Sequence, residues 1–488
     1  MTDWRDQDPG LPIKLGPCSN GEYDPEPLSP VLTEVVRRAR EACDENAERL
    51  GMSRREFLLS MCGAATTLFV LDAITARAEA SPPGGRYLIP REAMLEPEAA
   101  EALLGGDGFV MDIQGHLLEY DLNPATRGRR FFGSVFPQVD CGEEDPRACF
   151  SIEHFMEEFF LRSDTSMVVL SALPIHPEGS PLSMEVMEET RRVALGLSRD
   201  RRVLLHAQAL PHLGTLPANL EAMEATVAGH PVVGWKTFTH FPDPATGLGW
   251  WLDDHEPGVP QVGEAFLRRS AELGIRNVCI HKGFSRRSRF GSPRDVGPAA
   301  RAHPDLNFLI YHSGFEARTP EGPYTEATAH LGVNRLISSL IEAGIGPNQN
   351  VYAELGSTWW YLMRTPSQAA HVLGKLLRYV GEDNVLWGTD SIFYGSPQDQ
   401  IQAFRAFQIS PELRDRYGYP PLTRRVKDKI LGANAARVYG VDPVTVPFTF
   451  TGQELDEIRR SLPGRHRTYG PADMTELRAF EEHHQGWP

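Results

Sequence analysis

Four residues that could bind a metal ion lie in short apolar segments far apart in the sequence. His116 ends the segment GFVMDIQGH, His281 lies in RNVCIHKGF, His312 lies in NFLIYHSGF and Asp390 lies in NVLWGTDSI. Two or three imidazoles with one carboxylate suit zinc, with manganese or iron as alternatives, and they leave a position open for water or substrate. The residue types therefore predict a site for one divalent ion, provided that the fold brings them together.

The segments that carry these residues belong to a longer alternation of apolar runs and helical patterns. Eight runs, the first at 108–116 and the last at 384–392, are short and mostly rich in Val, Ile and Leu, as strands buried on both faces should be. Helix candidates between them are Met184–Leu197, Leu216–Ala228, Val262–Leu273, Gly332–Ala343 and Ser367–Val380. Eight strands separated by helices predict an α/β fold, a (β/α)8 TIM barrel with loop insertions. A doubly wound open sheet is the alternative, but the glycine-rich phosphate loop expected after its first strand is missing.

A barrel of this kind gathers the polar residues at one place. All eight carboxyl ends of the strands meet at the same face of a parallel barrel, so residues far apart in sequence converge there. On the first strand Asp112, Gln114 and His116 alternate and therefore project to one side. A lone histidine at a strand end is more often a hydrogen-bonded structural residue than a ligand. Four such residues at four strand ends favour a metal site.

The strand-end pattern resembles the amidohydrolase superfamily, in particular the branch with aminocarboxymuconate-semialdehyde decarboxylase and γ-resorcylate decarboxylase. The matching segments are MDIQGH, GWKTF, VCIHKGF, FLIYHSGF, VLWGTDSIFYG and KILGANAARVYGV, which cover most of Phe109–Val441. The resemblance implies that His116 and His281 bind the metal. It also implies that Asp390 is both a ligand and a proton handler, and that His312 acts as acid and base beside the metal.

One position departs from the family pattern. The first strand of the family usually carries His-x-His, or Glu-x-His in some decarboxylases, whereas this chain has Gln114-Gly115-His116. A neutral amide is a weaker ligand for zinc than an imidazole. Gln114 either binds the metal through its carbonyl oxygen, orients a water molecule or does not touch the ion. A barrel without activity, used for binding or structure, is therefore one of the hypotheses.

A second set of residues near the strand ends is predicted to contact the substrate. These are Lys236, His206, His240, Trp359, Trp360 and Arg286. Each has a plainer interpretation as well. Lys236 occupies the place where binuclear relatives carry a bridging carboxylated lysine, but one metal is expected here and an ion pair inside the barrel would explain it. The two histidines could cap loops, the tryptophans could anchor a subunit interface, and Arg286 begins a basic run that is typical of a solvated loop.

The N-terminal region contains a segment that resembles an export signal. Ser53-Arg54-Arg55-Glu56-Phe57-Leu58 opens an apolar stretch that ends near Ala78-Glu79-Ala80, as in a twin-arginine signal. We expect residues 1–52 to be an extension outside the fold, 53–80 the signal segment, 81–442 the barrel and 443–488 a C-terminal extension. The prediction is a periplasmic or secreted protein that engages the twin-arginine export machinery. The alternative is a cytoplasmic protein in which the arginines lie on an amphipathic helix, and the apolar stretch is too short for a stable membrane span.

The net charge limits the classes of binding partner that are expected, and the cysteines allow one disulfide. The formal net charge is −16, which argues against nucleic acids and anionic membranes because both select basic surfaces. A small-molecule substrate and a homo-oligomer are expected. Of the six cysteines, Cys141 and Cys149 could form a bridge around a small loop if the protein is exported, and two reduced thiols are an equal alternative.

Two reactions suit the predicted site equally well. The first is hydrolysis of an ester, lactone or amide, in which a metal-activated water attacks and Asp390 or His312 moves the proton. The second is non-oxidative decarboxylation of an aromatic or unsaturated acid, in which one of these residues protonates the carbon that loses CO2. Export favours hydrolysis, since decarboxylases of this kind usually serve cytosolic catabolism.

Overall fold

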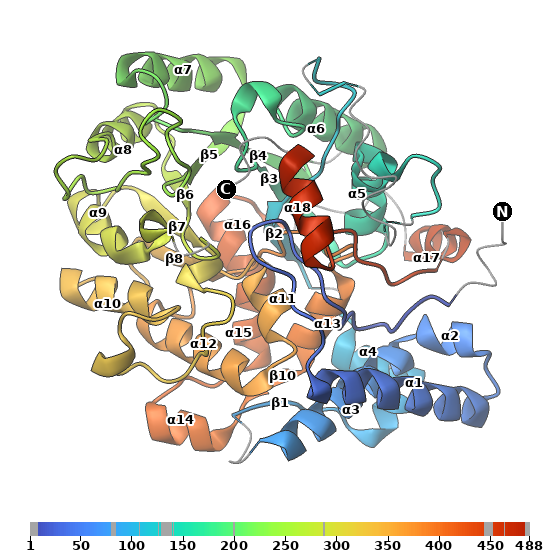
Figure 1. The fold of residues 1–488 in the computed structure, drawn as a ribbon. Helices are drawn as coiled ribbons and strands as arrows, with labels where there is room; N and C mark the ends of the chain where they lie inside the picture. Colours follow the sequence, from blue (N-terminus) through green and yellow to red (C-terminus); the bar gives the residue numbers. More distant parts are fainter. Residues whose placement is uncertain are drawn as a thin grey trace.

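Eight parallel strands form the centre of the molecule (Figure 1). The structure is a computed structural model and describes residues 8–79, 84–106, 108–124, 126–127, 139, 141–198, 201–285, 288–443, 452–462 and 464–483. The strands pair in chain order and are β2 (Val110–Gly115), β3 (Thr165–Ser171), β4 (Val203–Gln208), β5 (Val232–Phe238), β6 (Asn277–His281), β7 (Asn307–Tyr311), β8 (Val351–Glu354) and β9 (Val385–Leu386). The predicted strands and their order are confirmed.

The first and last strands close this sheet into a barrel. The segment after β9 runs beside β2, where Asp390 N donates to Gln114 O at 2.9 Å and His116 N donates to Ser391 O at 2.7 Å. The eighth strand is thus shorter than the predicted segment 384–392, because its second half leaves regular geometry while keeping its backbone hydrogen bonds. This seam brings the first-strand and last-strand residues of the predicted site side by side.

Helices surround the barrel, and side chains fill its interior. The outer helices are α5 (Ile152–Met156), α6 (Met184–Ser198), α7 (Leu216–Gly229), α8 (Gly263–Glu272), α9 (Val296–Ala302), α10 (Asn334–Ala343), α11 (Thr358–Leu362), α12 (Pro366–Tyr379), α13 (Gln398–Ala406), α14 (Pro411–Tyr417), α15 (Arg424–Asp428) and α16 (Asn434–Tyr439). Inside the barrel, Met111, Met167, Val169, Cys279 and Leu309 are at most 1% exposed. The interior is a packed core, so chemistry is confined to the rim.

The N-terminal region is part of the fold. Its helices are α1 (Pro30–Leu50), α2 (Arg54–Leu58), α3 (Met61–Ala78) and α4 (Pro97–Leu104), and the antiparallel pair β1 (Gly85–Tyr87) and β10 (Phe407–Ile409) follows on the same side of the barrel. Ahead of α1, Ile13 and Leu15 are buried, and Lys14 Nζ pairs with the buried Asp399 Oδ1 at 2.8 Å. The prediction that residues 1–52 lie outside the fold is wrong for the described residues 9–50. Residues 9–29 are irregular, so their burial leaves no period in the sequence.

The signal-like segment is folded against its surroundings. Arg54 Nη1 pairs with Asp44 at 2.6 Å, and Arg55 Nη2 donates to Gly464 O at 2.5 Å. Among the described helices, α3 has the length and apolar composition to cross a membrane, with 56% of it buried inside the protein. Asp72, which interrupts the apolar run, pairs with Arg86 at 2.6 Å. These contacts do not test export, so the twin-arginine signal stays a prediction.

The C-terminal tail also lies on the barrel. It contains α17 (Gly452–Ser461) and α18 (Met474–His483), and Figure 1 shows α18 beside the N-terminal trace in front of the strands. Tyr469 N donates to Phe393 O at 2.7 Å, and Tyr469 OH donates to Glu158 Oε1 at 2.9 Å. Ser19 N donates to Pro471 O at 2.9 Å. The two ends of the chain therefore meet over the face where the site is predicted.

Cys141 and Cys149 form a disulfide in the structure. The sequence left open a disulfide or two reduced thiols at these positions, and the structure has the disulfide. The other four cysteines, Cys18, Cys43, Cys62 and Cys279, are buried thiols. Disulfides persist in oxidising compartments, and export stays a prediction.

Candidate active site at the barrel rim

His116 and Asp390 form the first half of the site, at the barrel seam. His116 Nδ1 lies 2.7 Å from Ser171 O, and a carbonyl can only accept, so this nitrogen carries the proton. The lone pair of the neutral ring is then on Nε2, which lies 3.0 Å from Asp390 Oδ1. Two acceptors this close need a shared proton or a cation. A histidine whose second nitrogen is fixed by a carbonyl is the usual arrangement of a metal ligand.

The Asp390 carboxylate is held from its other side. Oδ2 accepts from Asn20 Nδ2 at 2.6 Å and from Ser357 Oγ at 2.5 Å. Burial raises the pKa of Asp390, but when no cation is bound the hydrogen bond and charge of a protonated His116, with those of His312 and the Ser357 hydroxyl, bring it below the usual value. Asp390 and Ser357 both have positive φ, 62° and 52°. Backbone strain of this kind at non-glycine residues is common at functional sites.

His281 and His312 form the second half. His312 Nδ1 donates to Gly356 O at 2.8 Å, which leaves Nε2 as an acceptor 3.2 Å from His281 Nδ1. Both rings are buried, and burial lowers the pKa of His312 to about 4 and that of His281 well below its ordinary value. Neutral imidazoles are the form that binds metals. His312 also has a positive φ of 64°.

Glu354, at the end of β8, positions His312. Its carboxylate accepts from His312 N at 3.0 Å and from Gly356 N at 2.5 Å, and burial raises its pKa well above the usual value. A Cβ at Gly356 would lie 2.3 Å from Gln114 Oε1 and 2.5 Å from Glu354 Oε1, so only glycine fits there. Glu354 was not predicted as a site residue, although a carboxylate at the end of an apolar strand was a signal for it.

The N-terminal segment contributes two further residues, Asn20 and Glu22. Glu22 Oε1 lies 3.4 Å from His281 Nδ1, and Glu22 Oε2 lies 3.5 Å from His312 Nε2. Asn20 Nδ2 lies 2.6 Å from Glu22 Oε2 and 2.6 Å from Asp390 Oδ2, so it joins the two halves of the site. The sequence carried no signal for these residues, because they lie in an irregular stretch without strand or helix periodicity.

Gln114 and Asp112 lie at the seam below His116. Gln114 Nε2 is 3.5 Å from His116 Nε2, and Gln114 Oε1 is buried without a hydrogen-bond partner among the described residues. Asp112 accepts from Gln114 N at 2.9 Å and from both the backbone and the hydroxyl of Thr389. Burial raises the pKa of Asp112 to about 7 despite these hydrogen bonds. Asp112 therefore ties β2 to the β9 end, and Gln114 keeps an unused carbonyl at the site.

Lys236 points into the same small pocket, which also contains His116, Asp390 and Glu22. Its Nζ lies 3.6 Å from the centre of the Tyr311 ring and has no hydrogen-bond partner among the described residues. The expected ion pair inside the barrel is thus wrong, since no carboxylate in the described part of the chain lies within 4.0 Å of it. Burial lowers the pKa of Lys236 to about 8. An unpaired buried ammonium at a pocket is a ready binding site for an anion.

His206 and His240, the two histidines predicted to contact the substrate, lie at different depths in the barrel. His206 Nε2 is 2.9 Å from Tyr439 OH, and its Nδ1 is 3.1 Å from Tyr311 OH, inside the barrel. The prediction that His206 contacts substrate is wrong, because barrel side chains occupy both of its nitrogens. The His240 ring lies 4.5 Å from the His281 ring and so belongs to the rim.

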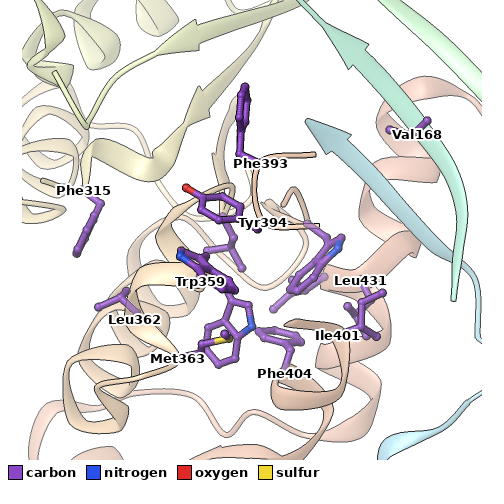
Figure 2. Close-up of a cluster of buried hydrophobic side chains, with 14 of the residues drawn as sticks. Val168, Phe315, Trp359, Leu362, Met363, Phe393, Tyr394, Ile401, Phe404 and Leu431 are labelled. Atoms are coloured by element: carbon purple, nitrogen blue, oxygen red, sulfur yellow. The ribbon is translucent and has the colours of Figure 1, made fainter. Parts of the chain in front are cut away.

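Trp359 and Trp360 are packed in the hydrophobic core next to the site. Trp359 donates to Gln400 O at 2.9 Å and its ring lies 5.2 Å from that of Phe404, and Figure 2 shows Trp359, Tyr394 and Phe404 in one buried cluster. Trp360 stacks on Tyr394 at 4.6 Å. Both tryptophans are at most 1% exposed, so they neither wall the pocket nor anchor a subunit interface. Helix α11 turns them inward.

The basic run after β6 is only partly described. Arg286, predicted to bind substrate, lies outside the described residues, as does Arg287. Arg289 is half exposed and pairs with Glu256 at 2.6 Å. This agrees with the plainer interpretation of a solvated basic loop for Arg289.

The structure brings donor atoms of Glu22, His281 and His312 within 4.8 Å of one another, a group that could hold a divalent ion, but His116 and Asp390 are not part of that group. Two ligands of one tetrahedral cation with bonds of about 2.1 Å are about 3.4 Å apart. The pairs His116–Asp390 at 3.0 Å and His281–Glu22 at 3.4 Å are close to that separation. The small pocket lined by His116, Asp390 and Glu22 has a volume of only about 10 Å³, far below the several hundred that a small-molecule site usually offers. This volume is that of an ion or a single water molecule.

Comparisons with known proteins found similar solved structures and one matching family model. Solved structures similar in fold include 2,6-dihydroxybenzoate decarboxylase from Rhizobium (15% identity, 68% of this chain and 99% of that one, TM-score 0.39) and 5-carboxyvanillate decarboxylase from Sphingomonas paucimobilis (13%, 68% and 99%, 0.40). A uronate isomerase from Bacillus halodurans also matches (14%, 91% and 96%, 0.35). No curated protein matches. A family model described as amidohydrolase matches residues 189–441, more than half of the chain. The chain therefore belongs to the amidohydrolase family.

Proposed function

We propose that this protein is a metal-dependent decarboxylase of a small aromatic or unsaturated carboxylic acid. Family membership makes the chain an enzyme of the hydrolase or decarboxylase type. The observation that carries the finer proposal is Lys236, whose ammonium group is buried and unpaired among the described residues of the metal pocket. Glu22, Asp390 and Glu354 act on this ammonium only from beyond ion-pair distance, so a carboxylate substrate could pair with it directly.

The surroundings of Lys236 suit a planar acid. Phe238 and Phe393 line the same pocket, and Lys236 Nζ lies 4.9 Å from the centre of the Phe238 ring. Aromatic walls favour a flat, unsaturated substrate and exclude water. A dry pocket strengthens the attraction between the ammonium and a carboxylate. It also favours loss of CO2, because the reaction removes the charge of the substrate carboxylate.

The metal would be held by His116, His281 and Asp390. We propose zinc, with manganese or iron as alternatives, because imidazole and carboxylate ligands suit all three. When bound, the ion would fix the oxygen atoms of the substrate and withdraw electrons from it. Gln114 has an unpartnered carbonyl at this place and could orient a water molecule or the substrate.

The chain's own residues would handle the proton. The bond between carbon and the carboxylate breaks, its electron pair stays on the ring carbon, and one proton replaces CO2. His312 Nδ1 is fixed by Gly356 O, so Nε2, which faces the site, would take a proton from water and pass it to that carbon. Asp390 is the second group in reach of the same space.

Hydrolysis of an ester, lactone or amide is the second candidate. The pair of His116 Nε2 and Asp390 Oδ1, 3.0 Å apart, supports it, because a carboxylate beside a metal ligand can take a proton from an activated water. The export prediction also favours hydrolysis. The unpaired Lys236 is the feature that hydrolysis of a neutral substrate would leave unused.

The test is a parallel screen of phenolic and unsaturated acids against lactones and esters, with CO2 release and acid release measured separately. We expect CO2 from at least one acid, with loss of that activity in Lys236→Met. Acid release from lactones alone would overturn the proposal in favour of hydrolysis. Less than half an equivalent of zinc, manganese or iron per chain after anaerobic purification would support the inactive barrel instead.

A further inference from the structure

The N-terminal segment presents Asn20 and Glu22 to the metal site from a fixed turn. Glu22 N donates to Asn20 Oδ1 at 3.0 Å, and Gly21, between them, has a φ of 98° that favours glycine. Tyr23 OH is 3.0 Å from Tyr394 OH, and the Tyr23 ring lies 4.9 Å from Phe284. The turn is therefore packed on the rim, and it holds the Glu22 side chain at 5% exposure.

The geometry of Glu22 is that of a ligand sharing an ion with His281. Their atoms Oε1 and Nδ1 are 3.4 Å apart, close to the separation of about 3.4 Å expected for two ligands of one tetrahedral cation. Donor atoms of Glu22, His281 and His312 all lie within 4.8 Å of one another. The second oxygen of Glu22 accepts from Asn20 at 2.6 Å, an outer hydrogen bond of the kind that orients metal ligands.

The charges at the site point the same way. Glu22 and Asp390 are both buried, and Asn20 brings an oxygen of each within 2.6 Å of one amide nitrogen. Each carboxylate lies within ion-pair distance of an imidazole. Two buried carboxylates this close favour a cation beside them, and the ammonium of Lys236, which acts on both, lies beyond ion-pair distance. A divalent ion would neutralise both.

We propose that Glu22 is a metal ligand of this enzyme, supplied by the N-terminal segment in place of the imidazole or carboxylate that Gln114 does not provide. This inference rests on the proposed metal-dependent function. It makes the segment a working part of the site, so a mature protein lacking residues 1–80 would have lost one ligand. It also places a ligand on the segment that covers the pocket.

The experiment compares zinc binding by three full-length proteins, wild type, Glu22→Gln and Glu26→Gln. Glu26 is the matched control, because it lies in the same segment but pairs with Arg318 at 2.8 Å on the surface. Affinity is measured by competition with a chelator, and metal content by elemental analysis. We expect Glu22→Gln to weaken zinc binding at least tenfold and Glu26→Gln to change it less than twofold. Unfolding of the metal-free proteins shows whether either substitution damages the fold.

A second measurement needs no variant. Hydrogen exchange of residues 18–24 in the wild-type protein should slow when zinc is added, because a ligand in this segment ties it to the ion. Equal zinc affinity in Glu22→Gln and wild type, or exchange in residues 18–24 that zinc leaves unchanged, would overturn the inference and leave the proposed function standing. A wild-type protein that binds no zinc, manganese or iron would overturn both.

Discussion

His116 Nε2 and Asp390 Oδ1 lie 3.0 Å apart because the first and last strands of the barrel are neighbours at its seam. Their backbones are fixed there by hydrogen bonds between Asp390 N and Gln114 O and between His116 N and Ser391 O. The side chains are therefore paired by barrel closure itself, before any ion binds. A site built on strand ends in this way is more rigid than one built on loops.

Removing either predicted imidazole ligand should remove the metal. We expect His116→Ala and His281→Ala to retain less than a tenth of the wild-type metal after dialysis, because each leaves the remaining buried donors without a complete ligand set. Elemental analysis measures this. His240→Ala is a control at the same rim, since its ring lies 4.5 Å from His281 but is not assigned to the ion. Full metal content in His116→Ala would remove that residue from the ligand set.

Asp390→Asn should separate binding from turnover. The amide keeps an oxygen for the metal but cannot take or return a proton, so we expect some metal to remain while kcat falls at least a hundredfold. Single-turnover kinetics on metal-loaded protein measures the chemical step. Activity close to wild type in this variant would contradict the role of Asp390 as proton handler.

Activity should depend on the charge of Lys236. Burial lowers the pKa of this lysine to about 8, so its ammonium form predominates below pH 8 and is lost as the pH rises through that value. We expect kcat/KM for an acid substrate to decline above pH 8. Lys236→Met should lower kcat/KM about 10- to 100-fold at pH 7, the size of a hydrogen bond to a charged group, and should lack this decline. A pH profile of the variant parallel to that of wild type would show that another group causes it.

The purified protein should keep its N-terminus. Cleavage after Ala80 would remove Lys14, whose buried pair with Asp399 holds the segment, along with Asn20 and Glu22. Intact mass spectrometry of protein from the native cell measures this. A mass that starts after residue 80, combined with full metal content, would show that the segment is dispensable.

Export itself is tested by the arginine pair. We propose that residues 53–80 direct export, and Arg54→Lys/Arg55→Lys should then leave the protein in the cytoplasm. Arg54 pairs with Asp44 and Arg55 donates to Gly464 O, so the variant must also be compared with wild type in thermal unfolding. Unchanged fractionation of a stable variant would favour the cytoplasmic alternative.

Much of the fold was predictable, because hydrophobic periodicity is a local property that survives in the sequence. The buried strands and the helices between them follow from runs of Val, Ile and Leu and from amphipathic patterns. The convergence of His116, His281, His312 and Asp390 followed from barrel topology alone. Where the pattern was interrupted, as after β9, only the strand length was wrong.

The missed residues share a physical cause. Asn20 and Glu22 sit in a stretch held by turns and side-chain hydrogen bonds, which leave no period to detect. Trp359 and Trp360 follow a strand end, where pocket walls are common, but the direction in which α11 turns them depends on tertiary packing. Such contacts between segments far apart in the chain are beyond patterns read within one segment.

The most direct test of the metal site is a crystal structure of the full-length protein grown with zinc, with anomalous scattering recorded at the zinc edge. We predict one strong peak at the barrel rim, bonded at about 2.0–2.2 Å to Glu22, His281, His116 Nε2 and Asp390. A second cluster, His154 with Glu157 and Glu158, also has donor atoms within 4.8 Å of one another and serves as the internal comparison. A peak at that cluster with none at the rim would contradict the account.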